Sequence, residues 1–206
     1  MAGVVVNDLT KNFWLFAVFA LLPTVAHAHL VNSGLGPFYD GTLHLLLSPG
    51  DLLGLLAAAL LAGLRGPRAS RLTVIVMPAA WLLFGLVGLN MPTSLQLPGL
   101  SVLSFMVLGA LVALDPKHLP EWAVAALAGL FGALHGLLNG SALAAIGAGT
   151  VSLLGIVTTV FVLTLIVASL IVPLRRAWMR IAVRVAGSWV AAVGMLMFGW
   201  LVRGAG

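Results

Sequence analysis

Residues 42–64 read TLHLLLSPGDLLGLLAAALLAGL, an apolar run long enough to cross a lipid bilayer. A transmembrane helix needs about 20 predominantly apolar residues to span about 30 Å of hydrocarbon. The run also contains a histidine, His44, an aspartate, Asp51, and the helix-breaking pair Pro49-Gly50 between them. The stretch therefore predicts a membrane helix that carries polar side chains and an interruption.

The whole chain has the composition of a membrane protein. Of its 206 residues, 62% are hydrophobic and only 7% are charged, and the mean hydropathy is +1.18. A soluble domain carries about 25% charged residues, so the lipid bilayer is the expected surrounding. Cysteine is absent, which excludes disulfides and thiolate metal sites.

Five more apolar stretches follow, at about 72–90, 98–114, 121–140, 148–172 and 185–202. None shows the alternation of apolar and polar residues that a lipid-facing barrel strand requires. The sequence therefore predicts an all-α fold, a polytopic bundle of six transmembrane helices that forms a single domain over residues 29–206.

The first 28 residues have the pattern of a secretory signal peptide. Lys11 precedes the apolar run FWLFAVFALLPTV, which leads to the small-x-small site Ala26-His27-Ala28. A basic start, a short apolar core and such a site are typical of a cleaved leader. We expect cleavage after Ala28; a retained leader would add a seventh helix. Residue 29 lies outside the cytoplasm in both cases.

Basic residues alternate between the links and predict the orientation of the bundle. Cytoplasmic loops are enriched in Lys and Arg, whereas links 90–98 and 139–148 contain no charge. We therefore expect a multi-pass protein of the bacterial inner membrane, with its mature N-terminus and its C-terminus in the periplasm. The basic residues are too few and too scattered for nucleic-acid binding. Those in the links are Arg65, Arg68 and Arg71 after the first stretch, Lys117 after the third, and Arg175, Arg176 and Arg180 after the fifth.

The first stretch holds one candidate site near its outer end. His44 and Asp51 are seven residues apart and share a face if the helix is continuous, but Pro49 should kink or break that helix. Broken membrane helices occur where protein or a watery cavity satisfies the freed backbone groups, and a buried aspartate usually has a functional partner. Alternatively, Asp51 caps a helix that restarts after Pro49.

The fourth stretch holds a second candidate site at a similar depth. His135 and Asn139 are four residues apart on one helix face, within LFGALHGLLNGSAL. Such a histidine is either a ligand or a hydrogen-bonded packing residue, and the sequence leaves both roles open. Three glycines at the small-xxx-small spacing that allows close helix approach share roughly this face: Gly132, Gly136 and Gly140.

The segment FYDGTLHLLLSPGDLLGLLAAALLAG, together with the later His135-Gly136 and Asn139-Gly140 pairs, resembles the HupE/UreJ family. These are small polytopic proteins regarded as nickel or cobalt permeases. In the family's first motif His44 takes the histidine position and Asp51 the aspartate position. Leu52 stands where the family usually has a second histidine, and Asn139 stands where another histidine is expected.

The resemblance and the polar residues together imply a permease for a divalent transition-metal cation. Nickel or cobalt is the expected cargo, with copper also compatible with imidazole ligands, and no permanently bound cofactor is expected. No nucleophile is recognisably paired with a base, so an enzyme is not expected. The alternative is a non-transporting membrane subunit or assembly factor, with a membrane-protein partner or as a homo-oligomer. The predicted metal-site residues are His44, Asp51, His135 and Asn139, with Asp40 and the amino-terminal His29 of the cleaved chain at the mouth.

A weak similarity between two parts of the sequence also favours an internal repeat. Leu43-His44 with Gly50 and Leu134-His135 with Gly140 occur early in the sequence and again in the fourth stretch. Two halves of three helices that enter the membrane in opposite directions would form an inverted repeat, which is common in transporters.

Overall fold

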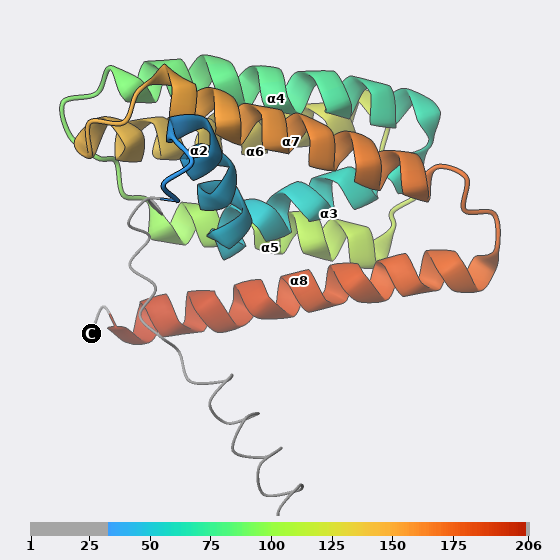
Figure 1. Cartoon of the computed structure of the whole chain (residues 1–206). Helices are drawn as coiled ribbons and strands as arrows, with labels where there is room; N and C mark the ends of the chain where they lie inside the picture. Colours follow the sequence, from blue (N-terminus) through green and yellow to red (C-terminus); the bar gives the residue numbers. More distant parts are fainter. Residues whose placement is uncertain (1–32, 205–206) are drawn as a thin grey trace, which may run out of the picture.

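The computed structural model of the chain describes residues 33–204 (Figure 1). Within this part all regular structure is helical, as predicted. The predicted signal peptide over residues 1–28 and the candidate ligand His29 lie outside the described residues. The helices are α2 (Pro37–Leu47), α3 (Pro49–Arg65), α4 (Pro67–Leu89), α5 (Pro98–Leu114), α6 (Glu121–Ala145), α7 (Thr150–Ile171) and α8 (Ala177–Gly204).

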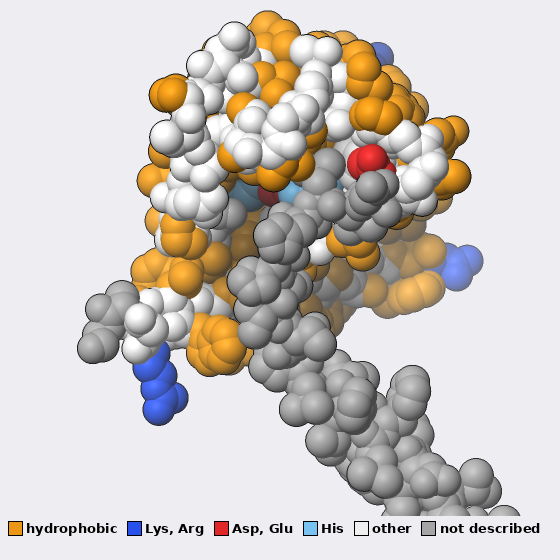
Figure 2. Space-filling model, turned by 60° about the vertical axis from the view of Figure 1, so that its left-hand side comes forward, with side chains coloured by type: hydrophobic (Ala, Val, Ile, Leu, Met, Phe, Trp, Pro, Cys, Tyr) orange, Lys and Arg blue, Asp and Glu red, His pale blue; other side chains and the backbone are white. Residues whose placement is uncertain are grey.

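The helices have the length and apolar character of membrane spans. Helices α4, α6, α7 and α8 are each long enough to cross a bilayer, and α2 with α3 form a fifth candidate if the bent pair counts as one span. Helix α5 has 17 residues, which at 1.5 Å per residue gives about 26 Å, slightly less than the hydrocarbon thickness. Four to five spans therefore meet the length criterion, where the sequence pattern predicts six. Hydrophobic side chains cover much of the face in Figure 2.

The first apolar stretch is broken at Ser48-Pro49, as the proline predicts. The axes of α2 and α3 differ by 76°, and Ser48 has an extended backbone with φ −92° and ψ 99°. The hydroxyl of Ser48 donates to the His44 carbonyl at 2.7 Å, and the Ser48 N–H donates to the Leu45 carbonyl at 3.3 Å. Serine therefore satisfies carbonyls that the proline would leave unpaired.

Glycines set how the central helices pack. A Cβ at Gly132, Gly136 or Gly140 would run into the backbone carbonyl of Met77, Trp81 or Gly85, respectively. Backbone-to-backbone contact of this kind is the purpose of small-xxx-small spacing in membrane helices. The glycine stripe of α6 thus lies against α4, and this contact fixes the rotation of α6 about its axis.

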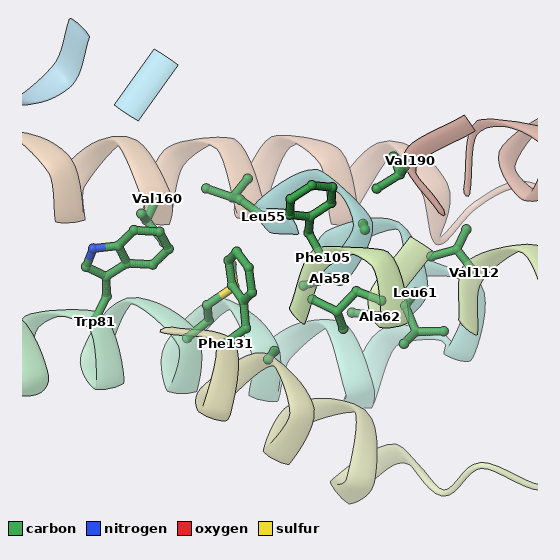
Figure 3. Packing of buried hydrophobic residues seen from close by; sticks show 14 of the residues in the cluster. Leu55, Ala58, Leu61, Ala62, Trp81, Phe105, Val112, Phe131, Val160 and Val190 are labelled. Carbon is green, nitrogen blue, oxygen red and sulfur yellow. The ribbon is translucent and has the colours of Figure 1, made fainter. Parts of the chain in front are cut away.

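The two ends of the bundle differ in charge. The links at 66, 115–120 and 172–176 lie at one end, here named the charged end, and α2 lies at the other, the α2 end (Figure 1). Buried apolar side chains fill the region between them (Figure 3). Leu55 and Leu61 of α3 are fully buried there. Apolar side chains therefore lie between the two ends. The predicted inverted repeat of three plus three helices stays a prediction.

Candidate functional site

Five polar side chains from four helices meet at the α2 end of the bundle. They are named here the polar cluster, and they comprise His44 of α2, Asp51 of α3, Ser104 of α5, and His135 and Asn139 of α6. Two residues from the first apolar stretch thus join two from the fourth, although 84 or more positions separate them in the sequence. The four residues predicted as the core of the site lie together.

Asn139 links the two halves of the cluster. Its Nδ2 donates to Asp51 Oδ2 at 3.0 Å and to the carbonyl of His135 at 2.8 Å. Its Oδ1 lies 2.7 Å from His44 Nε2, where a protonated Nε2 donates to it. An amide can donate to a carboxylate on one side and accept from an imidazole on the other, so asparagine suits this central position.

His135 is held on every side. Its Nδ1 contacts Asp51 Oδ1 directly, and its Nε2 lies 2.9 Å from Ser104 Oγ. Its ring stacks on Phe131 with centroids 4.1 Å apart and lies 5.8 Å from the ring of Trp81. The imidazole is only 1% exposed, so its orientation is fixed by contacts from three neighbouring helices.

Asp51 is a buried carboxylate whose ion-pair partner within residues 33–204 is the His135 ring, which is charged only when protonated. It is 9% exposed, and none of the lysines and arginines in the described part of the chain contacts it. Its oxygens instead meet the His135 ring and the Asn139 amide. Figure 2 shows histidine and acidic side chains recessed behind the apolar surface. A buried carboxylate of this kind is costly unless a cation or a proton joins it.

The break between α2 and α3 brings His44 and Asp51 to Asn139 from different helices. They would share one face only of a continuous helix, and the break that Pro49 predicts, with a bend of 76°, places them on separate helices. His44 instead approaches Asn139 from α2, while Asp51 approaches it from α3. The break thus lets two side chains of one short segment reach opposite ends of the same amide.

Asp51 does not cap its helix. The N-cap of α3 is Ser48, no side chain forms a cap hydrogen bond there, and Asp51 lies in the first helical turn. The helix dipole favours a carboxylate at this place, but both Asp51 oxygens are directed to side chains of α6. The alternative of a simple cap is therefore not supported.

Asp40 stands apart from the polar cluster. Its Oδ1 accepts from the Ser33 N–H at 2.7 Å and from the Ser33 hydroxyl at 2.6 Å. Over residues 33–204, no hydrogen bond or ion pair joins Asp40 to the cluster. Its predicted role at the mouth of the site remains a prediction, as does that of His29.

Ser104 joins the site although nothing in the sequence singles it out among the hydroxyls of an apolar helix. Asp51, His135 and Ser104 lie in the order of a hydrolase triad, although the sequence pairs no nucleophile with a base. However, the Ser104 hydroxyl lies 2.7 Å from the Ser101 carbonyl and donates to it. The hydrogen is thus directed away from the base, and the arrangement orients the histidine.

The candidate metal ligands of the polar cluster are hydrogen-bonded to one another. Across the residues that the structure describes, no group of three or more His, Asp or Glu side chains is arranged to hold a metal ion. His44 is bonded to Asn139, and Asp51 and His135 are bonded to each other. An ion would have to displace these hydrogen bonds to bind here.

A second buried aspartate lies at the charged end. Asp115 Oδ1 accepts from Arg65 at 2.6 Å, and its Oδ2 meets Lys117 and, at 3.5 Å, Arg180. Burial raises the pKa of Asp115, but the Lys117 hydrogen bond and the charges of Lys117, Arg65 and Arg180 outweigh it and hold the pKa below its usual range. The carboxylate therefore stays ionised and joins α3, α5 and α8.

Comparison with known proteins identifies the family. A sequence model described as HupE / UreJ protein matches residues 17–197, which is most of the chain. A search of curated proteins and a search of solved structures each found no match. The matched family is of the membrane-transporter type and is associated with nickel or cobalt transport or with urease and hydrogenase maturation. This multi-pass membrane protein therefore belongs to the HupE/UreJ family.

Proposed function

We propose that the protein is an inner-membrane permease for a divalent transition-metal cation, nickel or cobalt, which enters at the polar cluster from the periplasm. One observation carries the proposal: Asp51 is a buried carboxylate beside the His135 imidazole and the Asn139 amide, and it has no lysine or arginine partner within residues 33–204. A permanent partner would neutralise the carboxylate, whereas its absence leaves the charge for an exchangeable cation.

The chemistry of the donors fits a late first-row metal. Imidazole nitrogen suits nickel, copper and zinc, and carboxylate or amide oxygen can complete such a set. Asp51 Oδ1 and His135 Nδ1 already face each other, so an ion that separated them would gain both as ligands. Asn139 Oδ1 and His44 Nε2 stand next to this position and would follow if their mutual hydrogen bond opened.

The apolar side chains between the two ends favour a carrier over an open pore. Along α3, Leu55 and Leu61 lie between Asp51 of the polar cluster and Arg65 at the charged end, and both are fully buried (Figure 3). An ion that left Asp51 towards the charged end would meet these hydrocarbon side chains. Transport therefore requires a rearrangement of helices, for which the break at Ser48-Pro49 offers a hinge.

The orientation follows from the charged links. Arg65, Lys117 and Arg180 all lie at the charged end, and cytoplasmic loops are the ones enriched in such residues. The polar cluster at the opposite end would then face the periplasm. The mature N-terminus and the C-terminus would lie on that same side.

A second candidate is a non-transporting subunit or assembly factor. It is favoured by the hydrogen bonds that already join the candidate metal ligands of the polar cluster to one another. The family's association with urease and hydrogenase maturation also favours it. In that role the cluster would serve to hold helices together.

The test is the metal content of cells that express the protein, measured by mass spectrometry for nickel, cobalt, copper, zinc and manganese. The His135→Ala and His44→Ala variants are compared with the wild type at equal membrane levels. His118→Ala is the matched control, because His118 is exposed and remote from the cluster. The permease requires that one metal rises and that only the cluster variants abolish the rise. If no metal rises with abundant, folded protein, the assembly factor is the better description.

A further inference from the structure

Ser104 lies where its hydroxyl group can determine which ring nitrogen of His135 carries a proton. It lies in α5, and its Oγ is 2.9 Å from His135 Nε2 and 2.7 Å from the carbonyl oxygen of Ser101. We propose that Ser104 is a positioning residue that holds His135 in the Nε2–H form, so that Nδ1 is the nitrogen presented to Asp51 and to the transported ion.

The argument begins with the single hydrogen of the hydroxyl group. A serine has one O–H donor and two acceptor lone pairs, whereas a backbone carbonyl can only accept. The short contact with the Ser101 carbonyl therefore takes the Ser104 hydrogen. The contact between Ser104 Oγ and His135 Nε2 then needs its hydrogen from the ring. His135 must carry a proton on Nε2.

This assignment fixes the role of the other nitrogen. With Nε2–H donated to Ser104, Nδ1 is the ring nitrogen that faces Asp51 Oδ1, and the hydrogen bond between these two atoms holds one further hydrogen, which an ion entering between them would displace. Asp51 alone would favour a ring protonated on Nδ1 only, because an ionised carboxylate accepts a hydrogen bond from Nδ1–H. That form would direct the lone pair to α5, away from the carboxylate. Ser104 opposes it and keeps imidazole nitrogen and carboxylate oxygen on the same ion position.

Packing prevents the His135 ring from rotating to exchange the positions of its two nitrogens. His135 is stacked on Phe131 with an interplanar angle of 29°, and Trp81 lies on a further side. The residue is 1% exposed, so rotation of the ring requires its neighbours to move. The partner of the second ring nitrogen is the feature that selects the metal-binding nitrogen of a histidine, and here that partner is Ser104.

The role in metal binding rests on the proposed function, but the tautomer does not. Removing the partner of a metal-binding histidine typically costs about 10- to 100-fold in metal affinity. We expect this loss for Ser104→Ala and recovery for Ser104→Thr, whose hydroxyl can make the same bond to the preceding turn. Ser169→Ala is the matched control, because Ser169 donates to the Ile166 carbonyl at 2.8 Å and its side chain is exposed on α7.

The experiment is nuclear magnetic resonance of ¹⁵N-histidine-labelled protein in lipid nanodiscs, with a parallel titration of Ni²⁺. The His135 signals are assigned from their loss in His135→Ala. We expect Nε2–H in the wild type and in Ser104→Thr, a shift towards Nδ1–H in Ser104→Ala, and no change in Ser169→Ala.

The outcomes separate the two proposals. A wild-type ring without a proton on Nε2, or a ring unchanged by Ser104→Ala, would overturn the role of Ser104 even if Ni²⁺ binds. The expected change of tautomer without Ni²⁺ binding in any variant would support the role of Ser104 in orienting His135 and count against the permease. A normal Ni²⁺ affinity in Ser104→Ala, in a protein that binds Ni²⁺, would overturn the positioning role in metal binding.

Discussion

Asp51 and Asp115 are both buried carboxylates at helix ends, yet they have opposite surroundings. Asp115 is surrounded by three cations, and its side chain is 3% exposed. Asp51 meets only an imidazole and an amide among the described side chains. A buried charge needs compensation in both places. At the charged end lysine and arginine side chains supply the compensation, and at the α2 end the proposed metal ion would supply it.

The built-in compensation at Asp115 has a structural result. Arg65 of α3 and Arg180 of α8 both reach the carboxylate, and Arg180 also donates to the Leu64 carbonyl at 3.1 Å. Helix α8 is otherwise packed along one side of the bundle, mainly beside α5 (Figure 1). The ion pairs therefore fasten its first turns to the rest of the domain.

The largest difference between the two aspartates should appear in transport. Asn at position 51 keeps the shape and can still accept from the Asn139 amide, so we expect Asp51→Asn to fold normally and to lose metal uptake down to background. Asp115→Asn should retain uptake per folded molecule. Radioactive or mass-spectrometric uptake, normalised to folded protein, checks both. Uptake at the wild-type rate by Asp51→Asn would contradict the proposed difference between the two aspartates.

Thermal stability should show the reverse order, with a larger loss in Asp115→Asn than in Asp51→Asn. Asp115→Asn leaves the guanidinium of Arg65, whose side chain is 8% exposed, without its charge partner, and breaking such a pair costs about 3 kcal/mol or more. Thermal unfolding in one detergent measures the loss. The exposed pair of Arg68 and Glu121, 3.6 Å apart, is the control, since Arg68→Ala should change stability by less than about 1 kcal/mol. Equal effects of the two substitutions would contradict a structural role for Asp115.

Displacing α6 should damage the α2 end selectively. A Cβ at position 140 would collide with the backbone carbonyl of Gly85, so Gly140→Ala forces α6 away from α4 and shifts Asn139 relative to Asp51. We expect a loss of about 1–3 kcal/mol together with reduced uptake. Gly199→Ala is the control, because nothing lies within 4 Å of a Cβ there. Unaltered uptake in Gly140→Ala, at equal protein level, would separate the glycine stripe from the site.

Acid should weaken the charged end only slightly and at low pH. The pKa of Asp115 is held below its usual value in the folded protein, so its contribution to stability is complete above the unfolded pKa, about 3.9. That contribution is lost as the pH falls through the lower, folded pKa. Unfolding temperatures measured between pH 6 and pH 2.5 should therefore drop more for the wild type than for Asp115→Asn. Parallel curves for the two proteins would show that Asp115 is not the group responsible.

The sequence predicts much of this arrangement for clear physical reasons. Apolar length and the absence of alternation indicate helices, and Pro49 indicates the break. Cost in lipid singles out Asp51, and glycine spacing indicates how closely α6 packs. These features depend on the local sequence pattern or on the free-energy cost of burying one polar group. Both can be recognised from the sequence alone.

What the sequence leaves out depends on helix orientation. The 76° bend lets His44 and Asp51 reach the two ends of the Asn139 amide from separate helices, and the sequence predicts the break at Pro49 but not its angle. Ser104 becomes part of the site only because α5 presents it to His135, and serines are common in apolar helices. The three partners of Asp115 come from three separate segments, so their meeting depends on packing and has no local signal.

The most direct test is a titration of Co²⁺ into the purified protein in lipid nanodiscs, followed by visible absorption, which reports nitrogen and oxygen ligands. We predict saturable binding to the wild type and to His118→Ala, and none to Asp51→Asn or His135→Ala. Saturable binding that survives both cluster substitutions, or no binding to the folded wild type, would contradict the claim that Asp51 is kept without a fixed partner in order to hold a metal ion.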